Sequence, residues 1–320
     1  MTSGSMRGRW VVSLMAMAAT LVPAIVNAQA ALPESRVVFV GHSLLNYDMI
    51  EVVKGLAESK GLLIRRAAQS NVGTNIANNW RQCRRSAYPN ENPWWELACD
   101  SIDAGTDRGP YDTLVITQVN NPIIDPSNPA NLGSTPEDFS RFLDLFLSRN
   151  PSGRAFFYTQ WEGVGSPWHR GAEWTTRIAE ELALFERVVV RIEEISRNTY
   201  GRSTDVNIIP ANLALRDLVI AAESGGIAGI TSRSQLFSDD VHMTPLGAYY
   251  LACVIHSSIY QQSPVGASGR TVGRWGGEIT NLSPEMARSL QQFAWNVVSR
   301  YRGWSGGIAR PRPPTQLKVD

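Results

Sequence analysis

A histidine and two carboxylates share one short segment late in the chain, 238–244, which reads SDDVHMT. Asp239 stands three residues before His242, so within one turn its carboxylate can reach the imidazole Nδ1–H. That contact would fix the tautomer and leave Nε2 free to accept a proton. The alternative interpretation is a surface turn with an incidental histidine, or an Asp that caps the next helix. An apolar helical pattern begins directly afterwards, at Leu246, and this position favours the catalytic interpretation.

A serine that such a base could activate lies almost two hundred residues earlier, in the stretch 36–46, RVVFVGHSLLN. The apolar run before Gly41 predicts a buried strand, and a helical pattern begins near Tyr47. Ser43 therefore stands where a strand ends and a helix starts, which is where open α/β sheets bind ligands. Free backbone N–H groups there can stabilise a developing negative charge. A G-x-S-x-G esterase elbow fits less well, because Leu45 replaces its second glycine and that elbow follows a mid-sheet strand.

Apolar runs and helical patterns alternate along the rest of the chain. This alternation predicts a central parallel sheet of about five strands, covered by helices on both faces, in one domain. An irregular insertion is expected at about 83–107. Strands are predicted before Gly41 and at 62–65, 113–117, 155–158 and 206–209, and helices at 49–59, 75–81, 136–148, 175–199, 212–223, 246–260 and 284–301.

Residues 1–30 have the pattern of a secretory signal peptide. Arg7 and Arg9 give a positive start, residues 10–26 are mostly apolar, and Ala28-Gln29-Ala30 fits a small-x-small cleavage site. A membrane anchor is the alternative, but the apolar run is short for a span. We expect a domain over 31–304, exported from a bacterial cytoplasm as a secreted or periplasmic protein without stable membrane insertion. The tail 305–320, rich in Pro and Arg, is expected to be disordered.

The charge balance argues against a nucleic-acid-binding protein. The formal net charge is +1, and removal of residues 1–30 with their two arginines leaves 28 basic and 29 acidic residues, or −1. Dedicated nucleic-acid binders show a basic excess. A hydrophobic content of 43% supports a sizeable core instead.

Three cysteines can be interpreted once export is assumed. Cys83 and Cys99 flank a polar stretch, and a disulfide between them would suit an oxidising compartment; two free thiols are the alternative. Cys253 lies in an apolar helical pattern and is expected in the core. His169 and His256 have no ligand spacing, so no metal and no cofactor is expected.

The motif Gly41-His42-Ser43-Leu44 after the first strand, together with Asp239-x-x-His242, resembles the SGNH (GDSL-type) hydrolase superfamily. The resemblance covers about residues 37–260. It implies a three-layer flavodoxin-like α/β fold and cleavage of acyl esters, with Ser43 as nucleophile, His242 as base and Asp239 orienting the base. His42 stands where the family has Asp or Asn beside the serine, and we expect it to contact substrate.

The resemblance also implies an oxyanion hole. The backbone N–H groups of Ser43 and Gly73 are expected to donate to it, since Gly73 matches the glycine of the family's second motif. The third motif, G-x-N-D, is occupied here by Gln118-Val119-Asn120-Asn121. Asn120 matches the side-chain donor, and Gln118 or Asn121 remains an alternative. One such donor is worth roughly 3 kcal/mol of transition-state stabilisation.

The resemblance suggests a substrate class as well. Exported members of the superfamily are often carbohydrate O-acetyl esterases, so a small-molecule or glycan ester is the expected partner. Trp161 follows a predicted strand and could stack on a sugar ring; an ordinary anchoring aromatic is the alternative, as for Trp94, Trp95 and Trp174. Two other functions remain open: a carbohydrate O-acetyltransferase with the same triad, and a non-catalytic glycan-binding protein that kept the fold.

Overall fold

The computed structural model describes Met1 and residues 34–84, 97–119, 132–165 and 172–302. The chain divides into two units, Met1–Ala31 and Leu32–Asp320, and all helices and strands of the described residues belong to the second. The predicted signal peptide (1–30) and tail (305–320) lie outside the described residues. The elements are β1 (Glu34–Gly41), η1 (Ser43–Leu45), α1 (Tyr47–Ser59), β2 (Leu63–Ser70), α2 (Ile76–Arg84), α3 (Ala98–Ala104), β3 (Thr113–Thr117), α4 (Thr135–Arg149), β4 (Arg154–Tyr158), α5 (Ala172–Tyr200), β5 (Val206–Ile209), α6 (Ala211–Glu223), η2 (Arg233–Gln235), α7 (Pro245–Tyr260), β6 (Arg270–Val272), β7 (Glu278–Asn281) and α8 (Pro284–Arg302).

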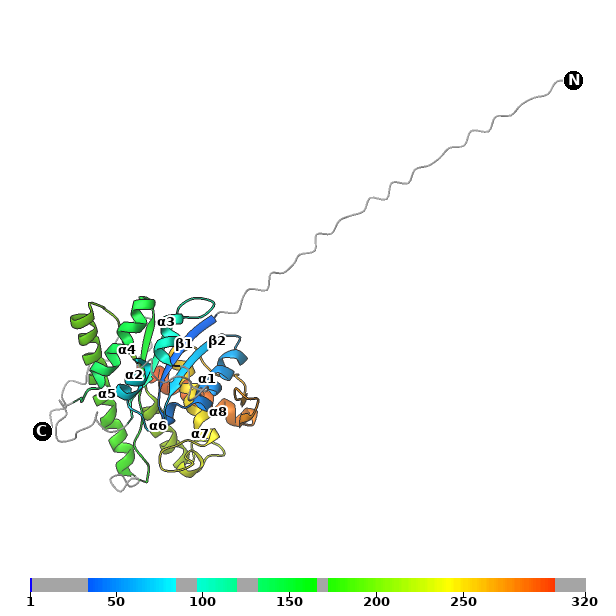
Figure 1. Ribbon diagram of the computed structural model, residues 1–320. Helices are drawn as coiled ribbons and strands as arrows, with labels where there is room; N and C mark the ends of the chain where they lie inside the picture. Colours follow the sequence, from blue (N-terminus) through cyan, green and yellow to red (C-terminus); the bar gives the residue numbers. More distant parts are fainter. Residues whose placement is uncertain (2–33, 85–96, 120–131, 166–171, 303–320) are drawn as a thin grey trace. The chain divides into compact units, whose positions relative to one another are not determined.

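Five strands form a parallel sheet in the order β2-β1-β3-β4-β5, which confirms the predicted α/β fold (Figure 1). The chain leaves β1 for the edge strand β2 and then crosses back to β3 on the other side of β1. From β1 the chain thus adds one strand on one side and the later strands on the opposite side, so the direction of strand addition reverses between β1 and β3. In open α/β sheets the crevice at the carboxyl ends of the strands, at such a reversal, is where ligands bind.

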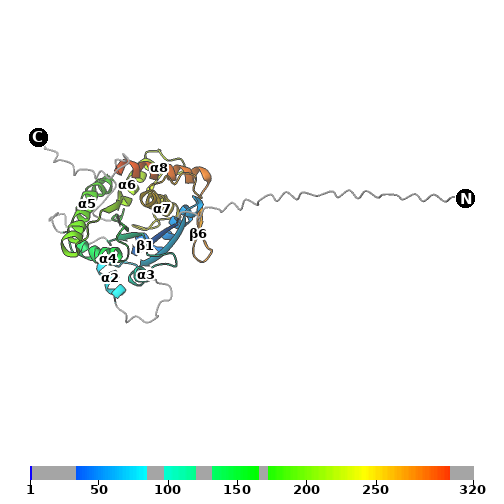
Figure 2. The same ribbon diagram turned by 90° about the horizontal axis from the view of Figure 1, so that it is seen from above.

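Helices cover both faces of the sheet, as Figure 2 shows from above. Along β1, Val37 and Phe39 belong to the core packed under α1, α6, α7 and α8. Val38 and Val40 belong to the core packed under α2, α3, α4 and much of α5. Because both faces are buried, the strand reads as a continuous apolar run rather than an alternating one.

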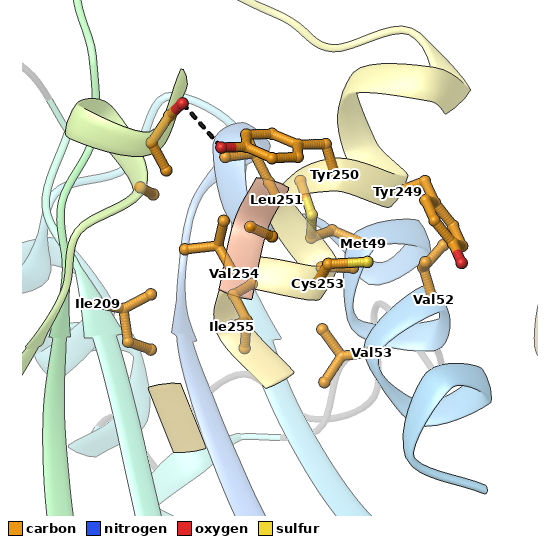
Figure 3. Packing of buried hydrophobic residues seen from close by; sticks show 14 of the residues in the cluster. Met49, Val52, Val53, Ile209, Tyr249, Tyr250, Leu251, Cys253, Val254 and Ile255 are labelled. Carbon is orange, nitrogen blue, oxygen red and sulfur yellow. Dashed lines mark hydrogen bonds between the residues drawn. The ribbon is translucent and has the colours of Figure 1, made fainter. Parts of the chain in front are cut away.

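Helix α7 anchors the segment that carries the histidine. Its residues Tyr249 to Ile255 are all fully buried, and they pack beside Met49, Val52 and Val53 of α1 (Figure 3). The Tyr250 hydroxyl donates to the Ala214 carbonyl at 2.9 Å. Cys253 is a free, buried thiol, as predicted. A helix this deeply packed gives the loop in front of it a rigid end.

The structure differs from the predicted elements in three places. Strand β2 extends to Ser70, because a sheet edge tolerates polar side chains such as Arg65 and Arg66 that weaken the apolar signal. The insertion predicted as irregular contains helix α3, whose inner face buries Cys99 and Ile102. The two-stranded antiparallel ribbon β6–β7 was not predicted. Among the described residues no helix is both long and apolar enough to cross a bilayer.

Candidate active site

Ser43 is the first residue of a single 3₁₀ turn between β1 and α1. His42 begins that turn in an extended conformation, and its Nδ1 accepts from the Leu44 N–H at 3.4 Å. Leu45 N–H donates to the His42 carbonyl at 2.8 Å. Asn46 then caps α1 by accepting from the Met49 N–H at 2.9 Å. The serine is thus held between two capped turns, with its side chain partly exposed.

His42 lies inside the protein, with 2% of its surface exposed. The expectation that it contacts substrate is therefore not supported. Burial lowers the pKa of His42 to about 4, an effect that the Gln118 carbonyl and the Gln160 side chain partly offset and that the charge of His242 reinforces. His42 is therefore a neutral, buried cap beside Ser43.

The Asp239 carboxylate and the His242 imidazole are hydrogen-bonded, with Nδ1 and Oδ2 2.7 Å apart. The other carboxylate oxygen accepts the N–H groups of His242, at 2.7 Å, and Val241, at 2.8 Å. These contacts, the backbone N–H of His242 foremost, lower the pKa of Asp239 to about 2. The carboxylate is therefore ionised at neutral pH, and it orients the imidazole; Nε2 of His242 makes no hydrogen bond to any residue that the structure describes. Asp239 also shapes the turn that precedes α7, but it does not cap that helix, whose N-cap is Thr244.

The histidine loop is attached to the loop that follows β4. Val164 N–H donates to the Asp240 carbonyl at 2.9 Å, and the Gly165 N–H donates to the Asp240 carboxylate. A Cβ on Gly163 would overlap that carboxylate. The sequence offered no role for Asp240, and this contact with the β4 loop was missed. Two glycines spaced by one residue after a predicted strand were the available sequence signal.

A second contact attaches the same region of β4 to the nucleophile turn. Tyr158, the last residue of β4, lies with its hydroxyl 3.5 Å from the Leu44 carbonyl, at the outer limit of a hydrogen bond. The turn that carries Ser43 and the loop that carries His242 thus each contact residues at or just after the end of β4. Both side chains are partly exposed there.

Within the described residues the Ser43 Oγ makes no hydrogen bond, so the serine and imidazole are not in contact in this structure. Catalytic hydrogen bonds are often long before substrate binds and tighten in the complex.

Two backbone donors beside the serine are unoccupied. The N–H groups of Ser43 and Gly73 donate to no group in the described part of the chain. Gly73 is the third residue of a turn closed by the bond from Thr74 N–H to the Asn71 carbonyl, 3.2 Å. Its φ of 65° favours glycine, and both N–H groups follow adjacent strands, since Gly41 pairs with Ser70. They could together receive an oxyanion.

Gln118, the alternative third donor, is buried and has hydrogen-bond partners inside the protein. It is 1% exposed, its Oε1 accepts from Ile76 N–H at 2.9 Å, and its Nε2 donates to Thr135 Oγ1 at 2.8 Å. These bonds join the end of β3 to the start of α2, next to the Gly73 turn. Asn120 and Asn121, the other candidates, lie outside the described residues.

Trp161 is buried, with 1% of its surface exposed, so its expected role as a sugar platform is wrong. Its Nε1–H donates to the Val241 carbonyl at 2.9 Å, which adds a further tie between the β4 loop and the histidine loop. Trp174 is also buried. Trp94 and Trp95 lie outside the described residues.

A disulfide joins Cys83 and Cys99, the pair expected from the sequence. It connects the end of α2 to the start of α3. Within the described residues, no three His, Cys, Asp or Glu side chains gather as metal ligands. His256 is a core residue, fully buried, and His169 lies outside the described residues.

Comparison with known proteins bears on the fold. No protein-family model and no curated protein matches the sequence. A DUF4886 family protein from Bacteroides uniformis is similar in structure, with a TM-score of 0.50 and 13% identity, over 83% of this chain and 95% of that one. Weaker similarities include a protein described as a GDSL-like lipase from Parabacteroides merdae (TM-score 0.44, 12% identity, 72% and 97% covered). Another is a carbohydrate esterase family 3 protein from Talaromyces cellulolyticus (TM-score 0.41, 13% identity, 71% and 97% covered). At 13% identity, the first similarity establishes a shared fold and nothing about chemistry.

Proposed function

We propose that this chain is a serine ester hydrolase of the SGNH type, acting through Ser43, His242 and Asp239. The observation that carries the proposal is the Asp239–His242 hydrogen bond, 2.7 Å long. The loop with this pair contacts the residues after β4, and the turn of Ser43 contacts the end of β4. A turn with a purely structural role would not need its carboxylate to contact the imidazole Nδ1 as well as the backbone. Acyl transfer needs that orientation, together with a nucleophile and donors for an oxyanion.

The mechanism follows from these positions. The Ser43 Oγ attacks the ester carbonyl carbon while its proton passes to His242 Nε2, and Asp239 stabilises the imidazolium. The carbonyl oxygen, now negative, is received by the N–H groups of Ser43 and Gly73. As the alcohol leaves, His242 returns the proton to it. A water molecule then releases the acyl group by the same steps and regenerates Ser43.

The substrate proposal is a small acyl ester, acetyl first, on a carbohydrate. It rests on the resemblance to exported members of the superfamily and on the expected signal peptide, and we propose export from a bacterial cytoplasm on the same basis. Trp161 and Trp174 are buried and therefore lend no support to sugar binding. A series of p-nitrophenyl esters from acetyl to octanoyl, followed by acetylated sugars, would define the acyl chain and the alcohol.

The test of the function is the hydrolysis of p-nitrophenyl acetate by the wild type and by Ser43→Ala. The variant is expected to lose activity by a factor of at least about 10³, as removal of a triad nucleophile does. Ser224→Ala is the matched control, because Ser224 is an exposed serine at the end of α6 and should change nothing. Retained hydrolysis in Ser43→Ala would overturn the assignment. Faster acetyl transfer to a glycan acceptor than to water would instead identify a transferase with the same triad.

A further inference from the structure

One buried side chain links the two loops that hold the unoccupied N–H groups. Asn79, on α2, is fully buried. Its Nδ2 donates to the Gly41 carbonyl at 3.0 Å, the last carbonyl of β1 before the turn of Ser43. Its Oδ1 accepts from Asn71 Nδ2 at 2.8 Å, and Asn71 is the first residue of the Gly73 turn.

The link is part of a larger buried network. Gln69 Nε2 donates to the Asn79 carbonyl at 2.8 Å and lies 3.3 Å from its Oδ1. Asn71 Nδ2 also reaches Gln82 Oε1, one turn further along α2, at 2.6 Å. Buried polar groups are costly unless satisfied, and a core at this place could have been apolar. The network therefore indicates a demand for fixed geometry rather than for stability alone.

The Gly41 carbonyl has two partners, and they fix it from two directions. It accepts from the Asn71 N–H at 3.1 Å, which continues the pairing of β1 with β2, and from Asn79 Nδ2. Ser70 Oγ donates to the next carbonyl, that of His42, at 3.0 Å. The strand pairing sets the spacing of the two loops along the sheet. Asn79 adds a contact from the helix side, which sets the tilt of the peptide that leads into Ser43.

We propose that Asn79 is a positioning residue for the oxyanion hole of the proposed esterase. It holds the Ser43 and Gly73 N–H groups at the mutual distance and angle that the negative oxygen requires, without touching substrate. The proposal rests on the proposed function. It predicts an effect on transition-state stabilisation, and hence on kcat, and little effect on the binding of the ester ground state.

The experiment compares Asn79→Asp and Asn79→Ser with Asn78→Asp. Asn79→Asp keeps the side-chain shape and the acceptor, but replaces the Nδ2 donor with an oxygen that repels the Gly41 carbonyl. Asn79→Ser removes the amide donor without adding a charge. It replaces Asn79→Asp in the experiment if the buried carboxylate of that variant prevents folding. Asn78 is the matched control, one residue away on the same helix, where it bonds the surface residue Arg81.

Steady-state hydrolysis of p-nitrophenyl acetate is measured per active site, with sites counted by fluorophosphonate labelling run to completion, so that unfolded molecules do not contribute. Both Asn79 variants are expected to lose about tenfold to a hundredfold in kcat, a part of what removal of a whole donor costs. KM should stay within about twofold, and the rate of phosphonylation should fall in parallel with kcat. The control should match the wild type.

A kcat per site within about twofold of the wild type in both variants would overturn the proposal. A fall in the number of sites with unchanged kcat per site would do the same, because it would show a purely structural role. These outcomes are separate from failure of the proposed function, which would appear as hydrolysis retained in Ser43→Ala.

Discussion

His242 Nδ1 lies 2.7 Å from Asp239 Oδ2, while Asp239 Oδ1 accepts the N–H of the same histidine at 2.7 Å. One carboxylate thus fixes both the backbone and the ring of His242. The ring orientation is set locally, within four residues, although its expected partner Ser43 comes from the other end of the chain. Two kinds of contact shape the site: contacts within one turn, such as Asp239–His242, and contacts between loops. Each kind can be tested with its own variants.

Asp239→Asn should separate orientation from folding. Asn retains an acceptor for the two backbone N–H groups, but an amide facing Nδ1 favours the wrong imidazole tautomer. We expect kcat/KM for p-nitrophenyl acetate to fall about 10²- to 10⁴-fold, by analogy with other triads, with an unchanged circular-dichroism spectrum. Asp100→Asn, an exposed acid in the first turn of α3, should have no effect. A loss smaller than about tenfold would mean that Asp239 only shapes the turn.

Because two histidines are buried, we expect the free energy of unfolding to decrease as the pH falls below neutrality. Burial lowers the pKa of His42 and of His256 to about 4, from the ordinary value of about 6.5. Between these values the unfolded chain binds protons that the folded protein does not, so stability is full above about pH 6.5 and decreases as the pH falls to about 4. Each histidine accounts for roughly 3 kcal/mol of this loss.

His256→Phe keeps a ring against Tyr260 and removes one of these groups. Urea unfolding at pH 7 and pH 4.5 should show a smaller loss of free energy in the variant than in the wild type. An equal loss in both proteins would contradict the buried, neutral state of His256.

Asp239 affects stability at lower pH, because its pKa is lowered to about 2. Its contribution to the free energy of unfolding is present above about pH 4 and is lost between about pH 4 and pH 2.

Asp240 should matter through its contact with the β4 loop. Asp240→Ala removes the acceptor of the Gly165 N–H, and Gly163→Ala places a methyl group against the same carboxylate. Each change is expected to lower kcat by about tenfold, because small displacements of catalytic groups are costly. Since the two changes break one contact, the double variant should resemble the single variants.

Gly277→Ala is the control for Gly163→Ala, because no atom lies within 4 Å of the added Cβ. Additive losses in the double variant would show that the two residues act independently and would contradict the proposed tie. The same kinetic assay serves all four proteins.

The disulfide between Cys83 and Cys99 should stabilise the helix pair α2–α3. It spans 16 residues of sequence, and a loop of that length is worth about 3 kcal/mol. The double variant Cys83→Ala/Cys99→Ala should lose about that much free energy of unfolding in urea, and dithiothreitol should destabilise the wild type but not the variant. Equal sensitivity of the two proteins to dithiothreitol would contradict this role. Because Asn79 lies on α2, a loss of kcat in the variant is expected as well.

The architecture was predictable because its signals are local. Strands such as Thr113–Thr117 and Val206–Ile209 are short apolar runs between helical patterns, and the sequence marks both ends of each. The Asp239–His242 contact was predictable for the same reason, since three residues of separation determine it. The serine turn was found from its position at the end of the first strand.

The remaining features depend on contacts between distant segments. Trp161 was expected at the surface, but Val241, eighty residues later, accepts its N–H. Gln118 was a candidate donor, but the start of α2 and Thr135 of α4 occupy its amide. Asn79 gave no signal, because an asparagine in a helical pattern normally lies on the surface, and Asn78 beside it is indistinguishable by type. Such residues are identified only when the loops have been brought together.

The central claim is that Ser43 is the nucleophile activated by His242, and site mapping of a fluorophosphonate adduct tests it most directly. The protein is labelled at neutral pH, digested, and the modified residue is located by mass spectrometry. The account predicts one adduct, on Ser43, labelling that is at least about 10³-fold slower in His242→Ala, and no adduct in Ser43→Ala. An adduct on another residue of an active enzyme, or labelling of Ser43 at the same rate without His242, would contradict it.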